Sequence, residues 1–576
     1  MKASDYIAQF LHLKGVTHVF ELSGGMITHL LDSISQTTPI KIITMHHEQS
    51  AAFAADAYGR MTGIPGVALA TSGPGATNLL TGIGSCYFDS SPAVFITGQV
   101  NTHELKSDRP IRQLGFQETD IVAMAQPITK ACFQVLDPLQ IPDIMEQAFA
   151  IATSGRPGPV LIDIPMNIQR GDVPTLPNPI ATIKNTTAFT DTLFESLLSD
   201  IKAAKRPLIL VGRGIDAAGA RKELLELVDK LQVPVVTSLL GLDLLHFDHP
   251  LRAGFIGSYG NRWANIAFGE SDLIVVIGCR LDIRQTGADT KYFENRIIYH
   301  VDCEEGEINN RIKNCIPVVG DAKAFICALL NSSILEKEQP LQRKAEWIDY
   351  IAALKEKWPD TAELNPVGIN PNKFMHQLSR RSVSAKAFLA DVGAHQMWAA
   401  QSLELGKDQI FMTSGGMGAM GFSLPAGIGA SIAAGNSPVV VLVGDGSMQI
   451  NIQELQTIVR NDLPVKVIVL NNRHLGMIRQ FQDSYFDSRY QSTYWGYSAP
   501  DFEKVATAYG IAAKTIENES DMEEAVEWMW SKEQQDKPVL LQVMIDPKTN
   551  TYPKIAFGKP ITEMEPFSKP IEMEGT

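Results

Sequence analysis

Short runs of aliphatic residues, each followed by a polar turn and a helical pattern, recur along the whole chain. The two clearest runs are residues 439–443 and 465–470. Runs of this kind, rich in β-branched residues and without strict alternation, are typical of strands buried on both faces of a parallel sheet. Their alternation with helical patterns predicts an α/β fold in which helices cover both faces of each sheet.

The pattern separates into three units, which we expect to form three doubly wound parallel-sheet domains at residues 1–170, 190–345 and 372–548. The strands expected in them are residues 17–20, 40–45, 66–71, 93–98, 160–164, 208–212, 233–237, 273–278, 297–302, 387–392 and the two runs above. Proline-rich stretches at 171–179 and 358–371 predict linkers, and residues 549–576 predict an irregular C-terminal tail.

Composition narrows the class of protein but not its chemistry. A chain of 576 residues is too long for one core, and 45% apolar with 20% charged residues describe an ordinary soluble protein. The net charge of −14 argues against nucleic acid or an anionic membrane as a partner. Six cysteines without a CxxC pair, and no pattern of a signal peptide or membrane span, predict a reduced cytoplasmic protein.

Polar residues follow the two clearest strands, at the sheet edge where α/β proteins bind ligands. Asp445 follows the first strand within Gly444-Asp445-Gly446, and Asn472 follows the second. Carboxylate and amide oxygens suit Mg²⁺, and flanking glycines let the backbone approach a phosphate. The pair therefore predicts a site for Mg²⁺ and a diphosphate, with two ordinary strand ends as the alternative.

Three other stretches carry weaker signals. Glu48 follows an expected strand and opens an alanine-rich helix, where the helix dipole alone also favours a carboxylate. The glycine-rich residues 414–421 fit either a phosphate at a helix start or tight helix packing. Gly212-Arg213-Gly214 lacks the third spaced glycine of a nucleotide-binding loop.

Motifs spread over nearly the whole chain resemble those of one enzyme family. They are His47-Glu48-Gln49, residues 71–78 and 97–100, Phe116-Gln117-Glu118, residues 155–160, Asp391-Val392-Gly393, residues 395–398 and 414–421, Gly444-Asp445-Gly446, Asn471-Asn472 and Gly476-Met477. Together they resemble the acetohydroxyacid synthase (acetolactate synthase) branch of thiamine diphosphate enzymes. The resemblance implies domains for the pyrimidine, FAD and the diphosphate, in that order. It also implies a homodimer or homotetramer with shared active sites, and allows a regulatory subunit.

The resemblance implies a role for each residue that matches a motif. Glu48 would hydrogen-bond the cofactor's pyrimidine ring, and Asp445 and Asn472 would bind Mg²⁺ with a backbone carbonyl near His474. Met420 would support the bent form of thiamine diphosphate. The other residues implied to contact this cofactor are Gly25, Gly73, Asn78, His395, Gly446, Ser447, Gly476 and Met477. Those implied on the substrate side are catalytic Gln117, Lys130 and Arg284, with Phe116 and Phe481 against the substrate.

Some of these residues also have plainer interpretations. Phe116 fits core packing and Lys130 a solvated charge. For the central domain the resemblance implies FAD in a structural role, with a flavin-free domain as the alternative. The matching residues are Gly212, Gly214, residues 257–260, Arg280, Asp282, Asp302 and Asp321.

Five positions or segments depart from the family's pattern. Phe481 stands where the family has a tryptophan that favours 2-ketobutyrate as acceptor, and Ile283 takes the place of a carboxylate beside Arg284. The loop at residues 100–116 is longer than usual, and Asn101 replaces a proline at its start. The basic residues of this loop are His103, Lys106, Arg109 and Arg112. Ala394 replaces a glutamine before His395.

The resemblance implies a carboligase that decarboxylates pyruvate and transfers the two-carbon unit to an acceptor carbonyl. A second 2-keto acid, giving 2-acetolactate, is the expected acceptor. The departures leave open a nucleotide-linked keto-sugar acceptor, whose diphosphate a basic loop would suit. A pyruvate oxidase or decarboxylase, and an inactive binding protein on the same scaffold, are the remaining alternatives.

Overall fold

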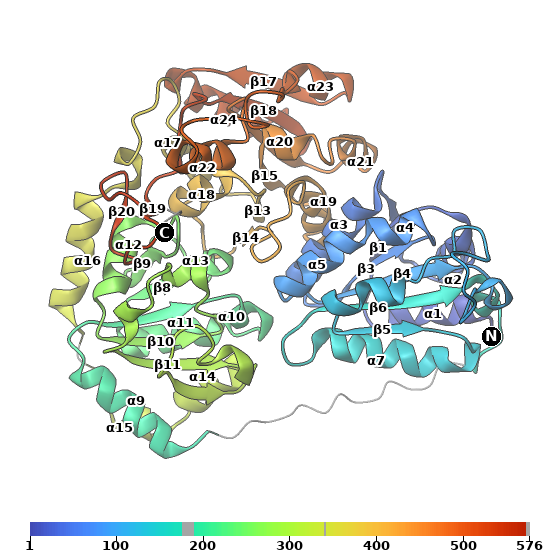
Figure 1. The fold of residues 1–576 in the computed structure, drawn as a ribbon, viewed down its shortest axis with the longest axis horizontal. Coiled ribbons are helices and arrows are strands. Elements are labelled where there is room, and N and C mark those ends of the chain that lie inside the picture. Colours follow the sequence, from blue (N-terminus) through green and yellow to red (C-terminus); the bar gives the residue numbers. More distant parts are fainter. Residues whose placement is uncertain (175–188, 339–340, 342, 572–576) are drawn as a thin grey trace.

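The computed structural model describes residues 1–174, 189–338, 341 and 343–571. Part of the first predicted linker, residues 175–179, and the last five residues of the predicted tail lie outside the described residues. The chain folds into three α/β domains, each built on a six-stranded parallel sheet with helices packed on it (Figure 1). The predicted fold class is confirmed. Among the described residues, no helix is both long and apolar enough to cross a bilayer.

The N-terminal domain has the strand order β2-β1-β3-β4-β6-β5. Its strands are β1 (His18–Leu22), β2 (Lys41–Thr44), β3 (Gly66–Ala70), β4 (Ala93–Gln99), β5 (Ala131–Gln134) and β6 (Pro159–Pro165). Its helices are α1 (Ala3–Leu13), α2 (Thr28–Thr37), α3 (Glu48–Thr62), α4 (Pro74–Asn78), α5 (Leu80–Phe88), α6 (Ile121–Ala125), α7 (Ile141–Thr153) and α8 (Met166–Gln169). One apolar core contains α1, α2 and α7, and another contains α3 and α5, so both faces of the sheet are covered.

The central domain has the strand order β12-β11-β10-β7-β8-β9. Its strands are β7 (Pro207–Val211), β8 (Val235–Thr237), β9 (Arg252–Phe255), β10 (Leu273–Ile277), β11 (Ile297–Asp302) and β12 (Ile316–Val319). Its helices are α9 (Asp191–Ala203), α10 (Gly214–Ala217), α11 (Arg221–Leu231), α12 (Arg262–Glu270), α13 (Ile283–Thr286), α14 (Ala322–Leu330), α15 (Ser333–Lys337) and α16 (Ala345–Lys357). Two apolar cores again lie on opposite faces of the sheet.

The C-terminal domain has the strand order β14-β13-β15-β16-β18-β17. Its strands are β13 (Ala387–Ala390), β14 (Ile410–Met412), β15 (Val439–Gly444), β16 (Val465–Asn471), β17 (Ala512–Ile516) and β18 (Val539–Met544). Its helices are α17 (Pro371–Arg381), α18 (Ala394–Ser402), α19 (Ser423–Ala433), α20 (Asp445–Met448), α21 (Glu454–Arg460), α22 (Gly476–Tyr485), α23 (Phe502–Ala508) and α24 (Met522–Met529). The two clearest sequence runs pair with each other as β15 and β16 at the centre of this sheet.

The N- and C-terminal domains share one apolar core through α3 and α19, which lie side by side in Figure 1. The approach is close because both helices are rich in alanine and glycine. A Cβ added at Gly429 would come 2.0 Å from the backbone oxygen of Ala54. Helix α19 therefore packs tightly on α3; it follows the glycine-rich residues 414–421, for which this contact does not decide between the two interpretations.

The predicted tail is not free of the fold. Residues 554–565 form a small antiparallel ribbon, β19 (Lys554–Ile555) with β20 (Met564–Glu565), that packs on the central domain. The Arg262 guanidinium donates to the backbone oxygens of Met564 and Glu565, at 3.3 and 3.0 Å. Ile561 and Met564 are buried in the central domain's core. The segment is irregular, as predicted from its prolines, but it is anchored.

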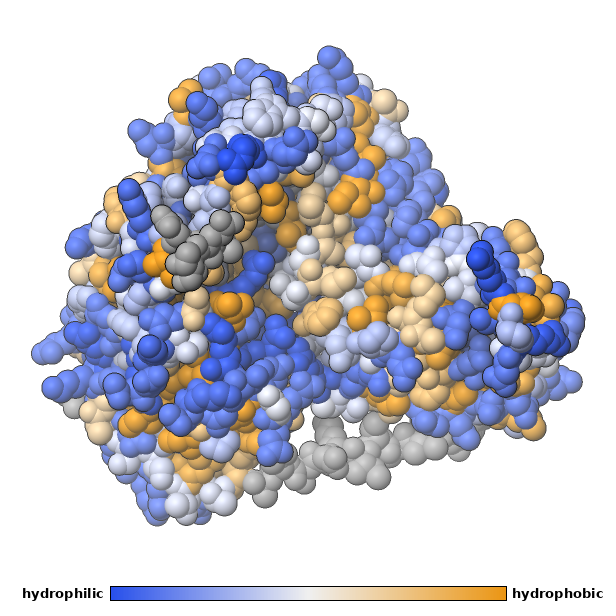
Figure 2. Space-filling model, in the orientation of Figure 1, coloured by the Kyte–Doolittle hydropathy of each residue, from blue (hydrophilic) through white to orange (hydrophobic). Residues whose placement is uncertain are grey.

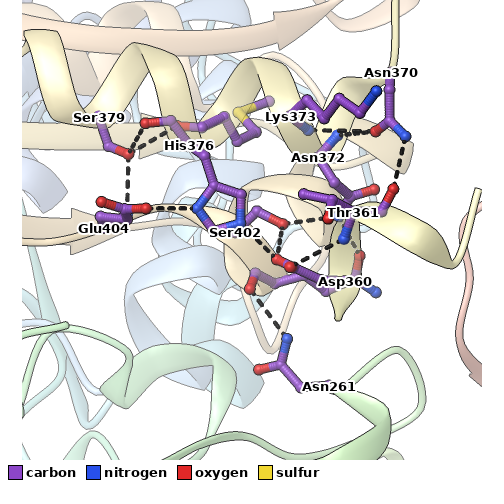
Figure 3. Close-up of polar contacts among 12 residues, drawn as sticks. Asn261, Asp360, Thr361, Asn370, Asn372, Lys373, His376, Ser379, Ser402 and Glu404 are labelled. Carbon is purple, nitrogen blue, oxygen red and sulfur yellow. Dashed lines mark hydrogen bonds and ion pairs between the residues drawn. The ribbon is translucent and has the colours of Figure 1, made fainter. Parts of the chain in front are cut away.

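The second predicted linker is fixed by a polar network around His376 (Figure 3). The ring nitrogens of His376 lie 2.9 Å from Asp360 Oδ2 and 2.8 Å from Glu404 Oε1. Ser402 Oγ also donates to Asp360 Oδ2, at 2.5 Å. Asn261 of the central domain donates to the backbone oxygen of Gln401, at 3.0 Å. The linker, the central domain and the C-terminal domain are thus joined by hydrogen bonds.

This network predicts a pH dependence of stability. Hydrogen bonds to Asp360 and Glu404 outweigh burial and raise the pKa of His376 above 6.5. Its contribution to stability is therefore complete below about pH 6.5 and is lost as pH rises through the higher folded pKa. We expect the Tm difference between wild type and His376→Gln, measured by thermal unfolding at several pH values, to shrink as pH rises from about 6 to about 9. Each 1 kcal/mol of stability that wild type loses over this range should reduce the Tm difference by roughly 2–4 °C.

Comparing wild type with His376→Gln isolates the contribution of His376, because the other charged groups near the network are present in both proteins and respond to pH in both. Those charges are Arg252, Lys355 and Arg380, besides the two carboxylates. Parallel Tm curves for the two proteins over this pH range would rule out a charged His376 in the folded state.

Candidate active site

One cluster of motif residues lies at the carboxyl edge of the N-terminal sheet. Gly25 follows β1, Glu48 follows β2 and opens α3, and Gly73 follows β3. Since the strands are parallel, these strand ends meet at one edge. Asn78 Nδ2 donates to Glu48 Oε2 at 2.9 Å, and the Glu48 side chain is almost fully buried. The carboxylate is therefore held in a fixed orientation at that edge.

Gln117 joins this cluster through the backbone of the loop after β4. Gln117 and Gly73 both have positive φ, at 65° and 62°, and a Cβ on Gly73 would lie 3.0 Å from Gln117 Cβ. Glycine is required at residue 73 by this contact and by its φ. A Cβ on Gly25 would instead meet no atom within 4 Å. The edge around Glu48 therefore has open space beside Gly25, as a planar ring would need.

A second cluster lies at the carboxyl edge of the C-terminal sheet, where β13, β15 and β16 end. Asp445 and Asn472 follow the neighbouring strands β15 and β16. A Cβ on Gly446 would lie 3.4 Å from Met420 Cε, which brings the glycine-rich loop to this point. Four other predicted residues lie at the same edge: His395, Ser447, Gly476 and Met477. Ser447 Oγ donates to Val392 O at 3.2 Å, close to His395 in the chain, and α22 begins at Gly476 just past β16.

Burial perturbs the ionisable groups of this second cluster. It raises the pKa of Asp445 to about 6 and lowers the pKa of His395 to about 3. The imidazole is therefore neutral at physiological pH, and its buried Nε2 has no protein partner. A nearby cation would stabilise the charged form of the buried Asp445 carboxylate, and a polar ligand atom would satisfy the unpaired ring nitrogen of His395. Both observations fit a Mg²⁺ diphosphate at this edge.

The candidate ligands at this edge are oxygen atoms, which is the kind that Mg²⁺ prefers. Within the described part of the chain, no group of three or more His, Cys, Asp or Glu side chains could hold a metal. Asp445 and the Asn472 amide oxygen, with a backbone carbonyl, would leave further positions for phosphate oxygens. The His474 ring stacks on Tyr494, with centroids 4.9 Å apart, and its Nδ1 lies 3.0 Å from Asn472 O. Its side chain is thus engaged, which leaves its carbonyl as the candidate ligand.

Three residues that support these clusters were not among the predicted site residues. The buried Asp391 carboxylate accepts from Gly421 N and Ser423 N, at 2.9 and 2.7 Å, and so fixes the end of the glycine-rich loop. Asp89 accepts from Gly415 N and Gly416 N at the other end. Tyr497 donates to Asp445 Oδ2 at 2.9 Å. Asp391 follows a strand within a recognisable motif, whereas Asp89 and Tyr497 have no local signal.

The two clusters remain separate within one chain. Among the described residues, no hydrogen bond joins the Glu48 carboxylate to the C-terminal domain or Asp445 to the N-terminal domain. Apolar side chains are exposed on both domains, over the loop before Gln117 and near the glycine-rich loop. They are Ile111, Leu114, Phe116, Met124, Met417 and Ile450. On the face shown in Figure 2, apolar and neutral side chains gather where the domains approach one another, and polar ones cover much of the periphery.

A third site is a cavity lined by all three domains. Of the residues predicted to contact FAD, those that line it are Gly214, residues 257–259, Arg280, Asp282, Asp302 and Asp321. Arg156 and Asp89 of the N-terminal domain and Gly415 of the glycine-rich loop complete the wall. Arg213 also lines it, and its buried Nε has no partner. Arginines for a diphosphate and carboxylates for ribose hydroxyls fit a dinucleotide.

Packing against another turn of the backbone explains why residues 212 and 214 are glycines. A Cβ on Gly214 would lie 2.5 Å from Gly278 Cα, and one on Gly212 would lie 2.5 Å from Gly278 O. Gly214 N donates to Gly278 O at 3.0 Å. These glycines allow the turns after β7 and β10 to touch. Their close approach is to another backbone, and this contact shapes the cavity wall.

Lys130 is not brought to the Glu48 cluster. It precedes β5 and so lies at the amino edge of the sheet, opposite Glu48. Its Nζ donates to Ile151 O and Ser154 O, at 2.5 and 2.6 Å, where α7 ends. A cation at the last carbonyls of a helix satisfies their unpaired acceptors. We therefore leave Lys130 out of the proposed site and assign it to capping α7.

The remaining substrate-side residues lie near the surface. Phe116 is 80% exposed, which excludes the core-packing interpretation. Phe481 is exposed on α22 and packs against Tyr485 and Phe486, with ring centroids 4.8 and 5.9 Å away. Arg284 lines the cavity of the central domain. Phe481 does not line that cavity, so Phe481 and Arg284 do not lie in one described pocket.

Comparison with known proteins agrees with this arrangement. Residues 1–124, 194–329 and 391–543 match the N-terminal TPP binding, central and C-terminal TPP binding domains of thiamine pyrophosphate enzymes. The chain is 37% identical to a probable acetolactate synthase large subunit of Methanocaldococcus jannaschii, over 100% of this chain and 96% of that protein. It is 36% identical to the acetolactate synthase isozyme 2 large subunit of Escherichia coli, over 98% and 99%. It is 34% identical to the acetolactate synthase large subunit of Lactococcus lactis, over 97% and 95%. The chain therefore belongs to the acetolactate synthase large-subunit family of thiamine pyrophosphate enzymes.

Proposed function

We propose that this chain is an acetolactate synthase, which decarboxylates pyruvate and joins the two-carbon unit to a second 2-keto acid. The proposal rests on the polar side chains at two sheet edges, one in the N-terminal and one in the C-terminal domain. One presents a buried, oriented Glu48, and the other presents Asp445, Asn472 and the orphaned His395 Nε2. The names of the relatives point to the same reaction.

The residues of the chain have distinct tasks in this proposal. Bound thiamine diphosphate supplies the carbanion and the electron sink for decarboxylation. Glu48, oriented by Asn78, holds a proton at the pyrimidine nitrogen. Asp445 and Asn472 bind Mg²⁺, and His395 lies against the diphosphate. Arg284 pairs with the carboxylate of the acceptor, since a guanidinium binds a carboxylate through two parallel hydrogen bonds.

We propose that the active site is completed by a second copy of the chain. The separation of the Glu48 and Asp445 clusters supports this, as do the exposed apolar side chains around both. In a homodimer, or in each dimer of a homotetramer, the Glu48 edge of one protomer meets the Asp445 edge of its partner. The relatives are named large subunits, so a smaller regulatory subunit is a further proposed partner.

We propose FAD as the occupant of the three-domain cavity, in a structural role. The cavity is lined at once by Arg156 from the N-terminal domain, Arg280 from the central domain and Gly415 from the C-terminal domain. A dinucleotide held there contacts every domain and so stabilises their arrangement without taking part in the reaction. Flavin absorbance of the purified protein tests the assignment directly.

The proposed reaction is tested by product analysis. With thiamine diphosphate, Mg²⁺ and ¹³C-labelled pyruvate, we expect labelled 2-acetolactate as the main product and loss of the activity with a metal chelator. Acetaldehyde or oxygen-dependent acetate as the main product would instead indicate a decarboxylase or an oxidase. Faster transfer to a nucleotide-linked keto-sugar than to pyruvate would assign the exposed basic loop to the acceptor.

A further inference from the structure

Helix α22 buries two polar side chains. Its buried residues are Arg479 and Gln480, whereas Phe481 of the same helix is 37% exposed. A buried arginine or glutamine is destabilising unless its hydrogen bonds are satisfied. The partners of these two side chains therefore determine how the helix is held.

Those partners come from the segment after β18. Gln480 and the backbone of Thr551 form a reciprocal pair, with Nε2 donating to Thr551 O at 3.1 Å and Thr551 N donating to Oε1 at 2.8 Å. The Arg479 guanidinium donates to Asn550 Oδ1, and more weakly to Lys548 O and Thr549 O at 3.5 and 3.4 Å. It also pairs with Asp483 at 2.6 Å. Residues 548–551 are thus clamped to α22 mainly through their backbone.

The clamped segment continues into contact with the loop that carries Arg284. Ile555 N donates to Ser258 O at 2.8 Å. The Ser258 backbone N–H and hydroxyl both donate to Arg284 O, at 2.6 and 3.2 Å. Phe557 packs on Tyr485 of α22, with centroids 6.5 Å apart. The C-terminal segment is therefore bonded directly to the helix of Phe481 and, through Ser258, to the backbone of Arg284.

We propose that Gln480 and Arg479 are positioning residues for the acceptor. By clamping residues 548–551 they tie the helix that carries Phe481 to the loop of Arg284, the residue proposed to pair with the carboxylate of the acceptor. The inference rests on the proposed function. It assigns the C-terminal segment to acceptor recognition and leaves the decarboxylation of the donor to the Glu48 and Asp445 clusters.

The test uses Gln480→Leu, which removes both hydrogen bonds to Thr551 at similar volume. Two buried backbone groups of Thr551 are then left unpaired and the clamp loosens, so we expect the KM for 2-ketobutyrate as acceptor to rise roughly tenfold, which is about 1.4 kcal/mol. CO₂ release from pyruvate in a single turnover stays within about twofold of wild type. Gln480→Glu keeps an oxygen for Thr551 N–H and gives an intermediate KM. Gln456→Leu, at an exposed position of α21, leaves all values unchanged.

A second measurement does not depend on activity. Lys548 is the first residue of the clamped segment and Lys554 follows it, so we expect limited trypsin digestion of the full-length protein to cut Gln480→Leu there several times faster than wild type. Unchanged acceptor KM together with unchanged cleavage would overturn the proposal, and so would an equal loss in donor turnover, acceptor KM and Tm. If the wild type makes no acetolactate, the proposed function fails, and the cleavage rates still decide whether the clamp exists.

Discussion

Replacing Glu48 by glutamine is expected to lower acetolactate formation by roughly 10²–10⁴-fold, the usual contribution of a positioned acid–base group. Glutamine has the same shape, and its amide oxygen can still accept from Asn78 Nδ2. It cannot hold and release a proton at the pyrimidine. We therefore expect the affinity for thiamine diphosphate, measured by fluorescence quenching, to change little while the rate of pyruvate consumption falls.

The matched control is Glu356→Gln at an exposed position of α16, which should keep wild-type activity. Equal pyruvate consumption by wild type and Glu48→Gln would exclude Glu48 as the acid–base group. It would also favour a binding protein on this scaffold over an enzyme if both rates are negligible.

Replacing Arg60 by methionine is expected to destabilise the protein by about 3–5 kcal/mol, as when one partner of a buried ion pair is removed. Arg60 is 3% exposed, and the Asp56 and Asp89 carboxylates that it pairs with are fully buried, at 2.6 and 3.0 Å. It also donates to Thr413 O at 3.0 Å, just before the glycine-rich loop. Without Arg60, two carboxylates are buried together without a cation. Denaturant unfolding measures the loss.

Two variants separate this cause from loss of packing. Arg60→Met combined with Asp56→Asn and Asp89→Asn removes the buried charge and should recover part of the lost stability. Arg489→Met removes an exposed arginine that pairs with Asp487, and should change stability by no more than about 0.5 kcal/mol. A triple variant less stable than Arg60→Met would show that the loss arises from volume and hydrogen bonding instead of unpaired charge.

The strands found from sequence are nearly all central strands of the three sheets. β15 and β16 consist of apolar residues because helices cover both of their faces, and burial itself makes the run visible. Most strands that sequence reasoning missed lie at sheet edges: β5, β9, β12, β14 and β17. These five edge strands are only three to five residues long, and β5, β12 and β17 are partly exposed, so their pattern resembles that of a loop; β12, for example, buries only Val318. The buried strand β18 was also missed.

The residues of the proposed cofactor site divide in a similar way. Glu48, Asp445 and Asn472 were found because each directly follows a recognisable strand, and parallel strands bring such positions to one edge. Lys130 has no such relation to a strand end, and the fold gives it to α7 as a cap. Asp89 and Tyr497 support the site from loops far along the chain from the groups they contact.

The sequence by itself determined that this protein has three α/β domains, and it pointed to the two sheet edges at which we propose that the cofactor binds, because periodicity and strand-end chemistry are local properties. Only the tertiary structure decided that Arg60 and Asp89 hold the glycine-rich loop and that the C-terminal segment clamps α22 beside Phe481. Such contacts join residues tens to hundreds of positions apart, and their energy comes from burying polar groups together. No local pattern encodes which distant partner satisfies a buried charge.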